Sequence, residues 1–176
     1  ISYGHGITVT PLQAAAVYGA IANGGNIIQP TLIKKKTHKK NKRIFSLETS
    51  KEINNILRKV VTDKEGTASL ADVHGFYVGG KTGTSQKYKN KEENLNTFIS
   101  IFPYQDPKYV LLIMLENPKI AKDLIYEYRG LKIRGSRNES GWNSVYLAGK
   151  IIKKIGPILA INNKEFNDNY VAQRSN

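Results

Sequence analysis

The sequence predicts an α+β fold in which helices pack on an antiparallel sheet. Its 176 residues are 40% hydrophobic, which is enough apolar material for the core of one domain. Apolar residues recur at helical spacing towards both ends, whereas the middle of the chain is rich in strand-forming residues. Helices outside and a hairpin inside are typical of helices layered on one sheet. We expect this domain over residues 1–160, followed by a polar tail over residues 161–176.

The first helix is predicted over Thr10–Asn23. Thr10 is a favourable N-cap, Pro11 suits the first helical position, and Gln13 can complete a capping box by reaching back to the N–H of the cap. The pair Gly24-Gly25 should end the helix. Its expected packing face carries Leu12, Ala16 and Ala20.

Two further helices follow from the spacing of apolar residues. The second should begin at Ser46 or Ser50, both favourable caps, and the third should end at Pro157, which cannot continue the hydrogen bonds of a helix. The apolar positions that define them are Ile53, Ile56, Leu57, Val60 and Val61 in the second helix, and Val145, Ala148, Ile151, Ile152 and Ile155 in the third.

Strands are predicted between these two helices. Thr97–Pro103 and Tyr109–Glu116 are rich in strand-forming residues, and the Asp-Pro pair between them favours the turn of an antiparallel hairpin. Tyr109–Glu116 is apolar on both faces, which predicts a central strand. Phe76–Ser85 is a further candidate, whose glycines would let a ligand or another backbone approach closely. Gly130–Gly141 is polar and is expected to be a loop.

A lysine in the glycine-rich segment fits two incompatible motifs. Residues 75–82 match the phosphate-binding pattern G-x-x-x-x-G-K-T, and Lys81–Thr84 read K-T-G-T. A phosphate-binding loop needs a buried strand before its first glycine and a helix that starts at the Lys-Thr pair. Neither is predicted here, because no buried strand precedes Gly75 and a glycine follows Thr82 directly. We therefore interpret the phosphate-binding match as coincidental.

The K-T-G-T interpretation requires four features of a serine acyltransferase site, and the chain has all of them. A serine acyltransferase of this kind needs a strand beside the substrate, a residue without Cβ at the contact, a cation, and hydroxyls for the substrate's carboxylate. Lys81, Thr82, Gly83 and Thr84 offer all four. The segment resembles the third active-site motif of penicillin-binding proteins.

The resemblance covers most of the chain and is specific to the class B, division-specific members, especially those of alphaproteobacteria. Its segments are Ser2–Gly25, Asp63–Thr84 and Glu139–Leu159. It implies the C-terminal portion of the penicillin-binding, serine β-lactamase-like transpeptidase fold. It also implies a peptidoglycan D,D-transpeptidase of septal wall synthesis, at the periplasmic face of the bacterial inner membrane. The implied partners are the stem peptide with its D-Ala-D-Ala donor, β-lactams, and membrane proteins of the division complex.

The roles that the family assigns to this motif can be carried over to the matching residues of this chain. Lys81 would bring positive charge to the serine and lysine that move the proton, and Gly83 would let the substrate lie against the strand. The hydroxyls of Thr82 and Thr84 would hold the donor's terminal carboxylate. The backbone N–H of Thr84 would be one of two oxyanion-hole donors. Strand alternation places Lys81 and Thr82 on opposite faces, so their joint use requires local twist or the reach of the lysine.

The nucleophile of this family is absent from the chain. It belongs to an S-x-x-K motif, and no serine here has a lysine three residues later. The second motif, S-x-N, matches only at Ser136-Arg137-Asn138, after the K-T-G-T segment instead of before it, and we interpret that match as chance. Because the chain also starts at Ile1, we expect an inactive fragment that holds one wall of the site. It should fold poorly as a monomer, because missing helices would leave apolar surface exposed.

The positive charge of the chain raises nucleic-acid binding as an alternative function. The net charge is +13, and seven of the ten residues in Lys34–Arg43 are Lys or Arg. Such a run could bind nucleic acid, but no aromatic residue within it could stack on bases, so we expect a solvated loop and no nucleic-acid partner. Other open alternatives are a D,D-carboxypeptidase or β-lactamase-type hydrolase of the same fold, and a degenerate fragment with only a structural role.

No metal or cofactor is expected. The chain has no cysteine, and His5, His38 and His74 lack the i, i+4 spacing of two ligands on one helix. The longest apolar run, Tyr109–Leu115, is shorter than the roughly 20 residues that a transmembrane helix needs. A membrane anchor is therefore expected outside this chain.

Overall fold

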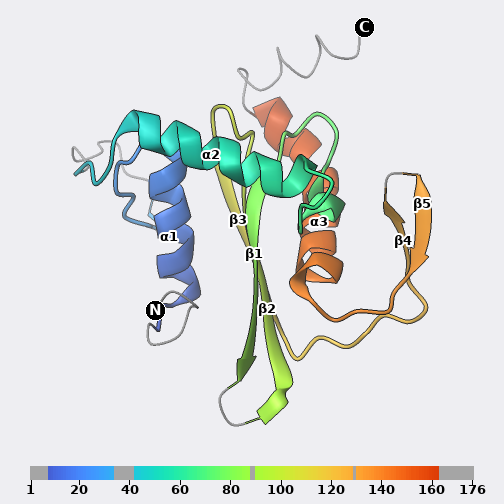
Figure 1. Ribbon diagram of the computed structural model, residues 1–176. Helices are drawn as coiled ribbons and strands as arrows, with labels where there is room; N and C mark the ends of the chain where they lie inside the picture. The colour runs from blue at the N-terminus through green and yellow to red at the C-terminus, as the bar shows by residue number, and fades with distance from the viewer. Residues whose placement is uncertain (1–7, 34–41, 88–89, 129, 163–176) are drawn as a thin grey trace, which may run out of the picture.

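In the computed structural model, a three-stranded antiparallel sheet carries helices on both faces (Figure 1). The structure describes residues 8–33, 42–87, 90–128 and 130–162. The elements, in chain order, are α1 (Pro11–Ala22), α2 (Leu47–Thr62), the 3-10 helix η1 (Ser69–Ala71), β1 (Gly79–Lys87), β2 (Asn90–Phe102), β3 (Tyr109–Glu116), β4 (Ile125–Tyr128), β5 (Leu131–Arg134), the 3-10 helix η2 (Ser140–Trp142) and α3 (Ser144–Asn162). The predicted α+β arrangement is confirmed.

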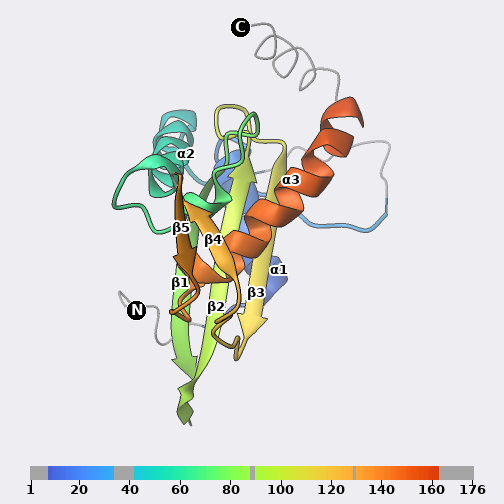
Figure 2. The same cartoon turned by 90° about the vertical axis from the view of Figure 1, so that its right-hand side faces the viewer.

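Strand β2 is the centre of the main sheet, with β1 and β3 antiparallel on either side. The prediction that Tyr109–Glu116 is central is therefore wrong for the described part of the chain. This strand is apolar on both faces because α1 packs on one face of the sheet and α3 on the other, and both helices contact β3 (Figures 1 and 2). Because helices cover both of its faces, this edge strand has apolar side chains on both faces, as a central strand would.

Helix α1 forms for the local reasons that its sequence indicates. Thr10 N donates to Gln13 Oε1 over 2.8 Å, and Gln13 N donates to Thr10 Oγ1 over 3.2 Å, so the predicted capping box is present. Gly24 ends the helix with a φ of 63°, in the left-handed region that favours glycine. The expected packing face is only partly correct, because Ala20 is buried whereas Leu12 is 62% exposed.

Helix α2 uses one of the two serines proposed as its cap. Ser46 accepts a hydrogen bond from Thr49 N over 3.0 Å and is the N-cap. Ser50 lies inside the helix, is buried, and donates to the carbonyl of Ile21. This bond ties α2 to the end of α1.

Helix α3 continues beyond Pro157, where it was predicted to end. The proline leaves the carbonyl of Lys153 without its helical donor, but Lys153 lies on the exposed side of the helix. Beyond the proline, Ala160 is buried in the core and Leu159 packs against it. These contacts favour continuing the helix over ending it at the proline.

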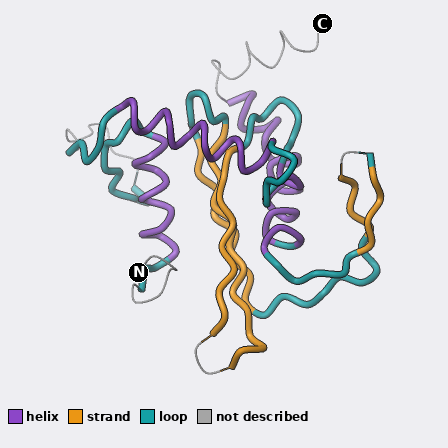
Figure 3. The backbone as a smooth tube through the Cα atoms, viewed as in Figure 1, coloured by secondary structure: helices purple, strands orange, loops and turns teal. Residues whose placement is uncertain are grey.

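The strand boundaries also differ from the prediction. Strand β1 begins at Gly79 and not at Phe76, because Tyr77 has a φ of 48° and interrupts the extended backbone. Strand β2 begins at Asn90, seven residues before the predicted start at Thr97. Residues 130–141 were predicted as a loop, but Leu131–Arg134 form β5, which pairs with β4. The β4–β5 hairpin lies on the α3 side of the main sheet (Figure 3).

The hydrophobic core lies between the sheet and α3. Its fully buried side chains come from β2 and α3, together with the segment that leads into β1, and include Phe98, Phe102, Val145, Ala148, Ile152 and Val78. The hairpin packs on η2 and α3 through Tyr126, whose ring lies edge-on to Trp142 and Tyr146 with centroids 5.2 and 4.9 Å apart. Strand β1 and η2 lie side by side.

Candidate active site on strand β1

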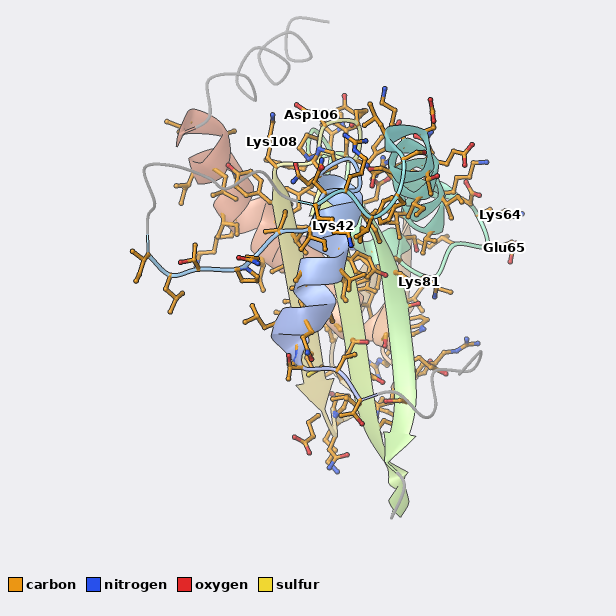
Figure 4. All side chains as sticks on the ribbon, turned by 90° about the vertical axis from the view of Figure 1, so that its left-hand side faces the viewer. Lys42, Lys64, Glu65, Lys81, Asp106 and Lys108 are labelled. Carbon is orange, nitrogen blue, oxygen red and sulfur yellow. The ribbon has the colours of Figure 1, made fainter. Side chains whose placement is uncertain are left out.

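The K-T-G-T segment lies within β1, the outer strand of the described sheet. Lys81 pairs with Ile99 and Thr84 with Asn96, in antiparallel register. Because Lys81 and Thr82 lie inside a strand and not at the start of a helix, the backbone excludes a phosphate-binding loop. Figure 4 shows Lys81 at this outer strand, on the same side as Lys64 and Glu65 in the loop that follows α2.

The backbone before β1 is held by an arginine of α2. Arg58 Nη1 donates to the carbonyl of Val78 over 2.7 Å and to Asp72 Oδ1 over 2.9 Å. The bond to Val78 fixes the residue directly before the strand. Arg58 therefore positions the start of β1.

The reach of Lys81 brings its ammonium group close to Thr82. Lys81 is exposed, and its Nζ donates to the carbonyl of Thr82 over 3.0 Å and lies 3.5 Å from Thr82 Oγ1. The two side chains leave the strand on opposite faces, as alternation requires. The length of the lysine side chain brings the cation and the hydroxyl together at the outer edge.

The hydroxyl of Thr82 forms a pair with that of Thr67. The two oxygens are 2.9 Å apart, and Thr67 lies in the loop between α2 and η1. Sequence reasoning missed Thr67, because its position beside β1 depends on packing between segments 15 residues apart. No local pattern at Thr67 indicates this contact.

The hydroxyl of Thr84 is engaged by Ser140 of η2. Ser140 N donates to Thr84 Oγ1 over 3.2 Å, and the two hydroxyl oxygens are 2.9 Å apart. The hydroxyl of Ser140 donates its single proton to the carbonyl of Gly83. In the contact between the hydroxyls, Thr84 must therefore be the donor and Ser140 the acceptor. Ser140, which is buried, is a second residue of the site that sequence reasoning missed.

The direction of the Thr84 N–H follows from the pairing of the strand. In an antiparallel strand, the N–H and C=O of one residue point to the same side, and the side alternates along the chain. The carbonyl of Thr82 accepts from Lys81, and that of Gly83 accepts from Thr97 Oγ1 on β2 over 3.2 Å. Gly83 therefore faces β2, and Thr82 and Thr84 face the outer edge. The N–H of Thr84 points away from the sheet.

Gly83 has a packing reason to lack a side chain. A Cβ added there would lie 2.5 Å from Thr97 Oγ1, which is closer than real contacts allow. The same close approach makes room for the Thr97–Gly83 hydrogen bond. A side chain at residue 83 would therefore require Thr97 to move and to give up this hydrogen bond.

A cavity of about 460 Å³ lies beside Thr82 and Thr84. One part of its wall is apolar, with Leu70, Tyr126, Ile133 and Trp142, and another part is polar or charged, with Glu65, Thr67, Arg137 and Glu139. Lys81 does not line the cavity. A ligand that combines apolar and charged groups could therefore lie against the hydroxyls of β1, with the ammonium of Lys81 at the strand edge.

The possible S-x-N match is part of the scaffold of this site. Asn138 Nδ2 donates to the carbonyl of Pro118 over 2.5 Å, and Asn138 Oδ1 accepts from Asn143 Nδ2 over 3.2 Å. Both ends of the amide are thus bonded to neighbouring residues. This supports the interpretation that the match is chance.

Some residues named in the sequence analysis lie outside the described part of the chain. His5, His38 and the basic residues 34–41 are not described. In the described ranges, no three His, Asp or Glu side chains come close enough together to hold a metal ion. No helix among these residues is long and apolar enough to cross a membrane.

Comparison with known proteins agrees with this geometry. The penicillin-binding protein transpeptidase domain family matches residues 1–137. The chain is 33% identical over 177 residues to a probable peptidoglycan D,D-transpeptidase FtsI of Caulobacter vibrioides, covering 93% of this chain and 28% of the relative. It is 40% identical over 134 residues to the stage V sporulation protein D of Bacillus subtilis, covering 67% of this chain and 20% of the relative.

A solved structure has the same fold. The apo transpeptidase domain of penicillin-binding protein 3 from Burkholderia pseudomallei superposes with a TM-score of 0.69 at 26% identity, covering 89% of this chain and 45% of that chain. The chain thus spans about a quarter and a fifth of the two curated relatives and less than half of this solved chain. The K-T-G-T strand, the fold and these similarities lead to one conclusion: the chain belongs to the penicillin-binding protein transpeptidase domain family.

Proposed function

We propose that this chain forms one wall of the active site of a division-specific peptidoglycan D,D-transpeptidase. The observation that supports this most strongly is the K-T-G-T strand, which presents a cation, two hydroxyls and an outward N–H at one edge beside a cavity. The similarity to proteins named peptidoglycan D,D-transpeptidase adds to it. The nucleophilic serine comes from an S-x-x-K segment outside these residues, so the chain alone is inactive.

In the proposed reaction, the serine oxygen attacks the carbonyl between the two terminal D-alanines of a stem peptide. The carbon–nitrogen bond breaks, the last D-alanine leaves as an amine with the serine's proton, and an acyl-serine remains. The amine of a second stem peptide then attacks the acyl carbon, the bond to the serine oxygen breaks, and the amine's proton returns to that oxygen, so that the cross-link forms and the serine is regenerated. Lys81 supplies positive charge to the groups that move the proton in both steps.

The Thr84 N–H is proposed to stabilise the oxyanion that forms on the attacked carbonyl, because it points outward from the strand edge. The hydroxyl of Thr82 binds the terminal carboxylate of the donor. The hydroxyl of Thr84 is a second candidate, although it has to exchange its bond to Ser140 for one to the carboxylate. Gly83 keeps the strand free of a side chain where the substrate lies alongside.

A hydrolase of the same fold would form the same acyl-serine but transfer it to water. The intact protein, incubated with an acyl-D-Ala-D-Ala peptide and an excess of an acceptor amine such as a D-amino acid, distinguishes the two. A transpeptidase yields mainly the peptide extended by the acceptor, seen by mass spectrometry. If only the shortened acid forms at every acceptor concentration, the protein is a carboxypeptidase.

The location and partners of the intact protein belong to the same proposal. Wall cross-linking takes place outside the cytoplasm, which agrees with a transpeptidase domain at the periplasmic face of the inner membrane, anchored by a segment outside this chain. Membrane proteins of the division complex are its proposed partners, β-lactams its proposed inhibitors, and nucleic acid is not a proposed ligand.

A further inference from the structure

The hydroxyls beside the cavity are not equally free to bind a ligand. The Thr84 proton is directed to Ser140 Oγ, and Thr84 Oγ1 accepts from Ser140 N. Any ligand that uses this hydroxyl must first displace a buried partner. Thr84 is therefore suited to holding η2 against β1.

The Thr67–Thr82 pair retains a proton for a ligand. Two hydroxyls carry two protons, and only one can lie between oxygens 2.9 Å apart. Lys81 Nζ lies 3.5 Å from Thr82 Oγ1 and favours negative charge nearby. If both hydroxyls turn outward, the pair offers one donor to each oxygen of a carboxylate.

Thr67 is held in place by its neighbours. Ala68 is fully buried, and its N–H donates to the carbonyl of Val60 over 3.1 Å, at the end of α2. On the other side, the carbonyl of Thr67 would lie 2.8 Å from a Cβ on Gly141, so the two backbones are in close contact. Thr67 itself is exposed and lines the cavity. Its hydroxyl is thus accessible while its backbone is fixed, which is the arrangement expected of a preorganised binding group.

We propose that Thr67 is a substrate-binding residue that, together with Thr82, holds the terminal carboxylate of the acyl donor. This rests on the proposed transpeptidase function and adds a residue from outside the K-T-G-T strand to the site. The occupant is a carboxylate because the pair offers two donors beside a cation. The hydroxyl of Thr84 can add to this site only after it exchanges its bond to Ser140.

The experiment compares Thr67→Val, which keeps the shape of the side chain but removes the hydroxyl, with Thr67→Ser, which keeps the hydroxyl. The second-order rate of acylation of the intact protein is measured with a penicillin and with the methyl ester of the same penicillin. Only the free acid has a charged carboxylate, so only there does Thr67→Val lose a hydrogen bond to a charged group. We therefore expect Thr67→Val to react about tenfold more slowly than the wild type with the free acid. With the ester it should react as fast as the wild type, and Thr67→Ser should behave like the wild type with both.

Thr49→Val is the matched control, since it makes the same change of side chain in α2, at a residue that does not line the cavity. It should leave both rates unchanged. If Thr67→Val slows acid and ester equally, or neither, Thr67 does not bind the carboxylate and the inference is wrong. A wild-type protein that no penicillin acylates would contradict the proposed function itself, so the two failures are distinguishable.

Discussion

In the proposed site Thr84 contributes two groups, its N–H and its hydroxyl, and substitution can separate them. Its N–H points outward from the strand edge, whereas its hydroxyl is bonded to Ser140. Thr84→Ala and Thr84→Val keep the N–H and remove the hydroxyl, and Thr84→Pro removes the N–H. The alanine and valine variants therefore test the hydrogen bonds to Ser140 and the proposed contact of the hydroxyl with the carboxylate. The proline variant also tests the proposed stabilisation of the oxyanion by the N–H.

We predict that Thr84→Pro lowers the rate of penicillin acylation of the intact protein by about 100- to 1000-fold, the usual effect of losing one oxyanion donor. Thr84→Ala and Thr84→Val should lose only about tenfold, the effect of one hydrogen bond to a charged group. Thermal unfolding must first verify that the proline variant is folded. If a folded Thr84→Pro reacts as fast as Thr84→Ala, the oxyanion donor is not at residue 84.

The residues of this site differ in how far the sequence could predict them. The K-T-G-T segment is contiguous, so its four residues could be recognised together. Thr67 and Ser140 join the site only because α2, η1 and η2 pack against β1, and no pattern in the sequence records that packing. The bond between Ser140 and Thr84, 56 residues apart, is a product of the whole fold.

At the scale of elements, η2 is attached to β2 through a buried asparagine. Asn96 is fully buried, and its Nδ2 donates to the carbonyl of Asn138 over 2.6 Å and lies 3.2 Å from Asn143 Oδ1. It lies opposite Thr84 in the register of the sheet. Asn96 therefore supports the loop that carries Ser140.

We predict that Asn96→Ala lowers the free energy of unfolding of the intact protein by about 2 kcal/mol, because the partly buried carbonyl of Asn138 loses this donor and Asn143 Oδ1 keeps only Ser144 N. Asn96→Asp should cost more, because a carboxylate would face two acceptor oxygens. Denaturant unfolding of the three proteins checks this. If the aspartate variant is as stable as the wild type, Asn96 does not support the loop that carries Ser140.

Tyr126 of the β4–β5 hairpin packs against Trp142 and Tyr146, and these surroundings affect its pKa. Burial raises the pKa of Tyr126 above its ordinary value of 10.0, and the nearby Tyr146 raises it further. The unfolded chain therefore loses this proton at a lower pH than the folded protein. The stabilising effect of the neutral phenol is present below about pH 10 and is lost as the pH rises through the folded pKa.

We predict that the free energy of unfolding of the intact protein falls as the pH rises above about 10, and that Tyr126→Phe reduces this fall. The phenylalanine ring keeps the packing against Trp142 and Tyr146 but has no proton to lose. Unfolding curves at several pH values check the difference between the two proteins. An identical fall in both would mean that Tyr126 does not contribute.

Elements whose ends depend on local chemistry could be predicted well, and those that depend on packing could not. The cap of α1 follows from three neighbouring residues, and it is present as predicted. Helix α3 passes through Pro157 because contacts of Ala160 and Leu159 with the core outweigh a local signal. Strand β3 is apolar on both faces because helices cover both faces. A strand with neighbouring strands at both edges can have the same composition, so the sequence alone does not show that β3 lies at the edge of the sheet.

At the scale of the whole molecule, the chain exposes considerable apolar surface. Val9, Leu12 and Val17, on and before α1, are each more than half exposed, and so are Leu32 and Ile33. Extended apolar surface of this kind favours association. The described chain therefore has surface suited to contact with other protein.

We predict that the isolated 176-residue chain associates in solution. Sedimentation velocity over a range of concentrations should show species larger than the monomer. Leu12→Gln together with Val17→Gln, which makes the exposed face of α1 more polar, should shift the distribution towards the monomer. A compact monomer that unfolds in one cooperative transition at all concentrations would contradict this prediction.

The central claim is that this chain supplies the K-T-G-T wall of a penicillin-reactive site whose nucleophile lies elsewhere. The most direct test is mass spectrometry of the intact protein and of the isolated 176-residue chain after incubation with a penicillin. The account predicts one stoichiometric acyl adduct on the intact protein, on a serine outside these residues, and no adduct on the isolated chain. A stoichiometric adduct on a serine of this chain, or an intact protein that forms none, would contradict it.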